Sequence, residues 1–153
     1  MRRRAVLDKP VLAEQTTCLQ MQQLIEQLAA KHQVDVSIAG VRLWLALPGT
    51  TERLLIASLS GGRVGLTHCV ADANEQLVCD MDLVFLVTEV GWRPIELLHA
   101  DAVWAAYVQG AATTGGAQVY DEAGEICLPS FAEYWVEQLT QQRWLEESQP
   151  LYV

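Results

Sequence analysis

The residues of this chain whose types could carry out chemistry gather in two short runs, residues 67–69 and residues 79–82. A histidine beside a carboxylate is the pairing that general acid–base catalysis uses. His68 with Asp80 or Asp82 could therefore form the catalytic pair of a hydrolase. The alternative is structural: a core histidine that donates one hydrogen bond, and strand-end carboxylates that accept from neighbouring backbone amides.

The spacing of the two runs predicts how they face each other. If they lie on neighbouring strands joined by a loop at 71–76, Val70 pairs with Leu77 and His68 lies across from Cys79. The other candidate ligands then point to the opposite face. A metal site needs three or four converging ligands. This face supplies two, so we expect no metal site.

The cysteines are scattered along the chain and form no C-x-x-C pair; they are Cys18, Cys69, Cys79 and Cys127. A nucleophilic thiolate requires an electropositive, partly open setting, whereas the neighbours of Cys69 and Cys79 are mostly acidic or apolar. We therefore expect reduced thiols that pack as small core residues.

Paired carboxylates suggest a second kind of chemistry. On a strand, Asp80 and Asp82 would share a face, as in a metal-dependent nuclease. Such nucleases also place a lysine nearby, and the chain contains only Lys9 and Lys31. No cofactor is expected either, because the Gly-Gly pairs at 61–62 and 115–116 lack the spacing of phosphate-binding loops.

Composition sets the class of protein to which these residues belong. The chain has 153 residues, 51% hydrophobic and 19% charged, which predicts one folded domain. Its net charge of −9 repels phosphate backbones, so nucleic-acid binding is disfavoured. We expect residues 1–15 to be a flexible arm and residues 16–153 to be the domain. Without an apolar stretch long enough for secretion or a membrane span, a cytoplasmic protein is expected.

The hydrophobic pattern predicts an α+β fold: a central antiparallel meander of about five strands, flanked by an N-terminal and a C-terminal amphipathic helix. The first helix is expected from Thr17 to about His32, with Thr16 or Thr17 as its N-cap. Strands are expected at residues 34–38, 41–47, 53–59, 64–70 and 77–87.

Turn residues predict how these strands connect. Gly61-Gly62 would form a two-residue hairpin loop that pairs Ser60 with Arg63. In this register Leu55, Ala57 and Leu59 share a face with Val64, Leu66 and His68. Because both faces of the hairpin are apolar, it should be central in its sheet and covered on each side.

After residues 92–94 the pattern predicts a helix at 101–108 and a short hairpin within 119–128. The final helix begins with Ser130 and Glu133, spaced as in a capping box. Its inward stripe is predicted to consist of Phe131, Tyr134, Trp135, Leu139 and Gln142.

Five tryptophans are many for this length. Core packing would account for most of them, but one or two on an exposed surface would mark a protein-binding site. Trp144 and Tyr152, near the C-terminus, are the predicted partner-binding residues.

Several segments resemble a bacterial and phage family known as a domain of unknown function, serial number 6908. They are V-G-L-T-H at 64–68, L-V-C-D-M-D-L-V-F at 77–85, W-R-P-I at 92–95 and S-F-A-E-Y-W-V-E-Q-L at 130–139. The chain departs from the family pattern at residues 74–76 and 80–81, where the family has Asn-Gly-Asp and Asp-Pro. The resemblance implies a mobile-element context and names no activity.

The leading functional hypothesis is a small, acidic, non-catalytic accessory protein that binds another protein. An anti-defence inhibitor that mimics DNA is a special case, because acidic residues run along the last helix; they are Glu133, Glu137, Glu146 and Glu147. The alternatives are the hydrolase that uses His68 with Asp80 or Asp82, and a self-associating homodimer.

Overall fold

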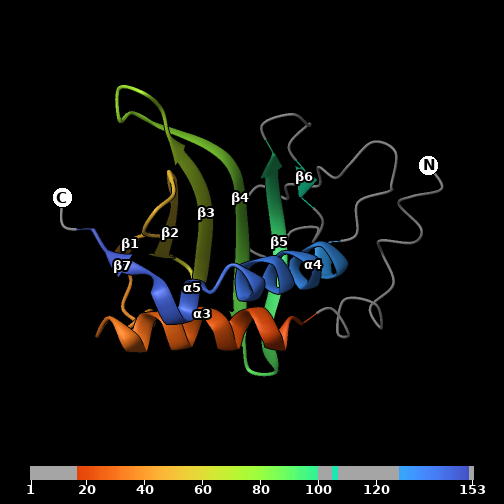
Figure 1. Ribbon diagram of the computed structural model, residues 1–153. Helices are drawn as coiled ribbons and strands as arrows, with labels where there is room; N and C mark the ends of the chain where they lie inside the picture. The colour runs from red at the N-terminus through yellow and green to blue at the C-terminus, as the bar shows by residue number, and fades with distance from the viewer. Residues whose placement is uncertain (1–16, 100–104, 107–127, 152–153) are drawn as a thin grey trace.

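The computed structural model describes residues 17–99, 105–106 and 128–151 (Figure 1). Within these ranges, seven strands form one antiparallel sheet in the order β6-β5-β4-β3-β2-β1-β7. The strands are β1 (Arg42–Ala46), β2 (Glu52–Leu59), β3 (Arg63–Ala71), β4 (Leu77–Thr88), β5 (Gly91–His99), β6 (Ala105–Ala106) and β7 (Gln149–Pro150). The helices are α3 (Leu19–Lys31), α4 (Leu128–Gln141) and α5 (Trp144–Glu147). The α+β class with a central meander is confirmed.

Helix α3 forms where the periodicity predicts it, with Met21, Leu24, Ile25 and Leu28 buried along one side. Its N-cap is Cys18, which makes no side-chain capping bond. The prediction that Thr17 caps the helix is therefore wrong; Thr16 lies outside the described residues. The first turn is held instead by the sheet, because the Cys18 amide donates to the carbonyl of Trp92 over 2.9 Å.

The predicted strand at residues 34–38 is absent, and this segment forms turns. The Asp35 carboxylate accepts hydrogen bonds from the Ser37 amide (2.9 Å) and the Ser37 hydroxyl (2.6 Å). An aspartate that bonds the backbone two residues later stabilises a turn in competition with a strand. Val34 and Val36 still pack against the core, which accounts for their apolar pattern.

The hairpin between β2 and β3 has the predicted glycines but a different register. Its loop contains three residues, 60–62, and Leu59 pairs with Arg63. This shift by one residue exchanges the faces of β2, because side chains alternate along a strand. Ile56, and not Ala57, is therefore opposite Leu66 and shares its buried face.

Strand β5 was not predicted, and it contains Pro94, although a proline cannot donate a hydrogen bond to a neighbouring strand. Pro94 fits here beside a bulge: Phe85 pairs with Pro94 and Val84 with Glu96, so Ile95 is the extra residue. Beyond β5, residues 105–106 form a strand where a helix at 101–108 was predicted. Most of the predicted hairpin at 119–128 lies outside the described residues, but Leu128 begins α4.

Helix α4 begins at Leu128, two residues before the predicted cap, so Ser130 lies inside the first turn. Its buried residues are Leu128, Ala132, Trp135, Val136 and Leu139. Tyr134 was predicted to face inward, but it is 60% exposed. After α4 the chain turns at Arg143, whose φ of 66° is left-handed, and α5 follows.

Both long helices contribute to one core on one face of the sheet (Figure 1). This core joins the inward residues of α3 and α4 to the alternate residues of the strands, among them Leu45, Leu54, Leu66 and Phe85. The prediction that the hairpin lies in the middle of the sheet is confirmed. The two long helices α3 and α4 pack on the same side of the sheet.

Candidate functional site

The site predicted around His68 depends on the register of β3 and β4, and this register differs from the prediction. Val70 pairs with Val78, and Cys69 with Cys79. A bulge follows, so that His68 pairs with Met81 and Asp80 is the extra residue of β4. His68 therefore does not lie across from Cys79. The bulge instead directs Asp80 to the side of the sheet that His68 occupies.

His68 is held between two carboxylates. Its Nδ1 lies 2.7 Å from Oδ1 of Asp80, and its Nε2 lies 3.0 Å from Oε1 of Glu52. The imidazole side chain is only 13% exposed. In its doubly protonated form the ring donates one hydrogen bond to each carboxylate. The cluster Glu52–His68–Asp80 thus joins β2, β3 and β4 side by side.

Glu52 was not identified from the sequence. Leu54 pairs with His68 across β2 and β3, so Glu52 is the diagonal neighbour of His68 on the same face. The correct hairpin register would have revealed this neighbour. A shift by one residue concealed it, because it placed Glu52 on the opposite face.

Asp82 does not belong to this cluster. It pairs with Thr67 on the other face of the sheet, and the Thr67 hydroxyl donates to Oδ1 of Asp82 over 3.0 Å. Burial raises the pKa of the Asp82 carboxyl, and the hydrogen bond from Thr67 partly opposes this shift. Of the predicted catalytic residues, the structure brings together only His68 and Asp80.

The geometry of the cluster suits a structural role, which is to link neighbouring strands through side-chain hydrogen bonds. A general base needs a ring nitrogen within reach of the proton that it removes. Both nitrogens of His68 are engaged by carboxylates, and no hydroxyl or thiol of a described residue hydrogen-bonds to either. Among the described residues, no group of three or more histidine, cysteine, aspartate or glutamate side chains is arranged to hold a metal ion.

Cys69 and Cys79 form a disulfide between β3 and β4, next to the His68 cluster. The expectation of reduced thiols is therefore wrong for these two residues. The predicted register concealed the pair, because it placed Cys79 across from His68 and directed Cys69 to the opposite face. Cys18 is buried, as expected, and Cys127 lies outside the described residues.

The disulfide lies at the base of a projecting hairpin, residues 69–79, which we call the hairpin arm. Figure 1 shows the arm extending beyond the helical layer at the upper left. Its turn is held by Asp72, whose carboxylate accepts hydrogen bonds of 2.8 Å from the amides of Asn74 and Gln76. Residues 72–79 are exposed, Leu77 and Val78 included.

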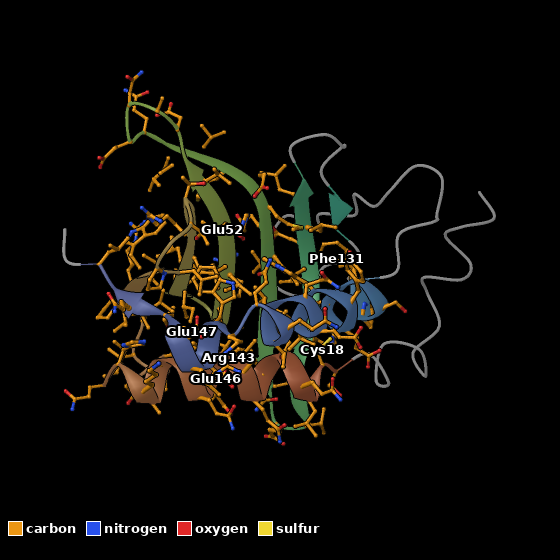
Figure 2. All side chains as sticks on the ribbon, in the orientation of Figure 1. Cys18, Glu52, Phe131, Arg143, Glu146 and Glu147 are labelled. Carbon is orange, nitrogen blue, oxygen red and sulfur yellow. A yellow bond between two sulfur atoms is a disulfide. The ribbon has the colours of Figure 1, made fainter. Side chains whose placement is uncertain are left out.

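A groove of about 340 Å³ lies on the outer surface of the helical layer, between α3, α4 and α5. Leu24 and Val136, both nearly buried, form part of its apolar floor. Glutamine side chains line much of it, and the exposed Glu137 and Glu146 belong to its rim. Figure 2 shows Glu146 beside α3, with Arg143 and Glu147 close by and Glu52 apart on the sheet.

Of the two predicted partner-binding residues, Trp144 lies in the described part of the chain, and it is not on the surface. Trp144 was predicted to be exposed, but it is completely buried, and its indole N–H donates to Oε1 of Gln142 over 2.9 Å. The turn at Arg143 causes this difference, because it directs the next residue into the core. Tyr152 lies outside the described residues.

No described helix has the length and apolar character that crossing a membrane requires. Comparisons with protein-family models, with curated proteins and with solved structures each found no match to this chain.

Proposed function

We propose that this chain is a non-catalytic accessory protein that binds another protein through the groove between α3, α4 and α5. The observation that carries the proposal is the combination of an apolar floor with acidic residues on the rim of one groove. Such a groove suits an amphipathic helix of a partner, whose apolar residues enter the floor. The partner segment should therefore carry Lys or Arg beside a small apolar anchor.

Charge supports this choice of partner. The basic residues described in the helical layer are Lys31 and Arg143, and both are engaged. The Lys31 ammonium donates to the carbonyls of Leu145 and Glu146, and Arg143 pairs with Glu147 over 3.0 Å. Within the described part of the chain, the carboxylates of Glu137 and Glu146 form no ion pair. The net charge of −9 disfavours a second copy of the chain or a nucleic acid as the occupant.

The His68 cluster supports a non-catalytic role, because both ring nitrogens are occupied and Asp82 faces away from it. The cytoplasmic location, the mobile-element context, the anti-defence role and the family resemblance remain predictions.

Site-specific crosslinking tests the proposal. A photoreactive amino acid is placed at Gln27 or Gln141, both in the groove, and at Glu89 in an exposed turn of the sheet as a control. After irradiation in host cells, crosslinked peptides are identified by mass spectrometry. The expected result is a single partner segment rich in Lys or Arg, crosslinked from the groove positions only. Crosslinks to a second copy, equal crosslinking from Glu89, or none from the groove would contradict the proposal.

A matched pair of charge variants then tests the electrostatics. Glu137→Lys with Glu146→Lys reverses the rim, whereas Glu75→Lys with Glu89→Lys makes the same change of charge on turns of the sheet. The rim variant should weaken binding of the identified segment by roughly tenfold to a hundredfold, whereas the control should have little effect. Equal effects of the two variants would mean that only the overall charge matters.

A further inference from the structure

The two sulfurs of the disulfide differ in their access to solvent. Cys69 is completely buried, whereas Cys79 is exposed on β4. The two residues are ten positions apart and close the hairpin arm at its base. A disulfide with one accessible sulfur is open to exchange with an external thiol, since exchange depends on access to the sulfur that is attacked.

We propose that Cys69–Cys79 is a reversible redox site, which exchanges with thiol reductants while the protein stays folded. An external thiolate attacks the sulfur of Cys79, which forms a mixed disulfide and breaks the bond to Cys69. Cys69 leaves as a thiolate and takes up a proton. A second external thiol attacks the external sulfur of the mixed disulfide and releases Cys79. Two external thiols are oxidised to one disulfide, and two protein thiols are formed.

The position of Cys69 favours this step. Arg53 is the register partner of Cys69 on β2 and lies on the same face of the sheet. Its guanidinium stays near the strand, because it donates to the carbonyls of Thr50 (3.3 Å) and Glu52 (2.9 Å). The departing thiolate therefore forms beside a strand that carries a cation, and nearby cations stabilise thiolates.

The architecture confines the consequence of reduction to the arm. The Glu52–His68–Asp80 cluster lies directly next to the disulfide and joins the same strands without a covalent bond. When the disulfide is reduced, this cluster still holds the base of the arm. Residues 70–78 become more mobile, while the sheet beyond His68 keeps its pairing. The site is distant from the groove proposed for partner binding and does not depend on it.

The cytoplasmic location expected in the sequence analysis would give the site a role. In a reducing compartment, stable structural disulfides are rare, and those that form are mostly redox-sensing or catalytic. The arm carries exposed Leu77 and Val78, so its order sets how these two side chains are presented. The redox state of the surroundings would therefore control how Leu77 and Val78 are presented.

Thiol trapping of the full chain tests the proposal. The protein is equilibrated in glutathione buffers of increasing reducing power, or with dithiothreitol, alkylated without denaturant, and digested for mass spectrometry. Circular dichroism of the same samples monitors the fold. The expected result is alkylation of the accessible Cys79 that increases with reducing power and disappears after reoxidation, with the fold retained. Reduction that occurs only together with global unfolding would show a purely structural disulfide. Failure of oxidised glutathione to re-form the bond would also overturn the proposal.

Hydrogen exchange supplies the second measurement. Reduction should speed the exchange of amides within residues 70–78 by about tenfold or more, and leave β1 and the start of β2 unchanged. The Cys69→Ser/Cys79→Ser variant should show the same fast exchange with and without reductant. A hairpin arm whose amides exchange equally in the oxidised and the reduced protein would overturn the proposed redox control of Leu77 and Val78.

Discussion

At the scale of single residues, the side chain of His68 links strands at the point where a bulge interrupts their backbone pairing. The bulge at Asp80 breaks the β3–β4 ladder, and the imidazole restores a link by contacting both neighbouring strands. His68→Ala would leave two partly buried carboxylates without their donor. We expect the free energy of unfolding to fall by about 1–3 kcal/mol, as measured by urea denaturation.

His32 provides the matched control for this substitution. It is also half-buried, but the one hydrogen bond of its side chain to another described residue, between Nε2 and the Ser148 hydroxyl, is 3.4 Å long. His32→Ala should therefore cost less than His68→Ala. If both substitutions lower the free energy of unfolding equally, the two carboxylates do not depend on His68, and its proposed role in linking the strands is wrong.

Asp82 should make stability depend on pH in a defined direction. Burial raises its pKa above the usual 3.8, so the folded protein holds this proton more tightly than the unfolded chain does. The free energy of unfolding therefore falls as the pH rises from 3.8 through the raised pKa of Asp82, and the ionised carboxylate lowers stability at neutral pH. Asp82→Asn should be more stable than the natural chain at neutral pH, and this advantage should shrink as pH falls towards 3.8.

Urea midpoints of the two proteins across this pH range check the prediction. Glu89→Gln, which removes a carboxylate from an exposed turn, is the control for the loss of one negative charge. A constant difference between Asp82→Asn and the natural chain at all pH values would mean that the amide stabilises through packing and not through the removed charge.

At the scale of elements, Gly91 determines how the β4–β5 turn meets the start of α3. Its φ is 140°, and an added Cβ would lie 3.2 Å from the side chain of Thr17. An L side chain is therefore strained there by its backbone and crowded by its neighbour. Gly91→Ala should destabilise the fold by about 1–3 kcal/mol in thermal or urea denaturation.

Gly65 is the matched control in the same sheet. Its φ is not in the left-handed region, and an added Cβ would meet Leu59 at an ordinary contact distance of 3.6 Å. Gly65→Ala should change stability by less than about 0.5 kcal/mol. A large loss of stability in both variants would indicate that the sheet does not tolerate added side chains in general. The constraint would then not be specific to the contact between the β4–β5 turn and the start of α3.

At the scale of the whole molecule, Trp144 connects the C-terminal segment to the core. It is completely buried and follows the turn at Arg143 that separates α4 from α5. The next segment forms β7, which pairs with β1 at the edge of the sheet. Trp144→Ala should therefore destabilise the whole domain by about 3–5 kcal/mol, as measured by calorimetry or urea denaturation.

The same substitution separates a core role from a surface role. Tyr134→Ala, on the exposed side of α4, should change stability by less than about 0.5 kcal/mol and serves as the control. A stable Trp144→Ala variant that loses only partner binding would contradict the structure and restore Trp144 as a surface residue.

The sequence alone determined the elements with strong local patterns. The helices α3 and α4 were recognisable from the helical spacing of their apolar residues. The strands β1 to β4 were recognisable as runs rich in Val, Ile and Leu between turn residues. His68 and Asp80 were also named as a candidate pair from their residue types. The predicted register directed Asp80 to the opposite face, however, and only the bulge in β4 brings the two side chains together.

Only the tertiary structure decided which residues face each other. Strand register is set by pairing between segments, and a shift of one residue exchanges the two faces of a strand. The three-residue loop at 60–62, the pairing of Ala71 with Leu77 and the bulge at Asp80 introduced such shifts, so Glu52, the Cys69–Cys79 bond and the face of Asp80 were missed or misplaced. The burial of Trp144 was decided in the same way, by a backbone turn at Arg143 that depends on packing against the rest of the molecule.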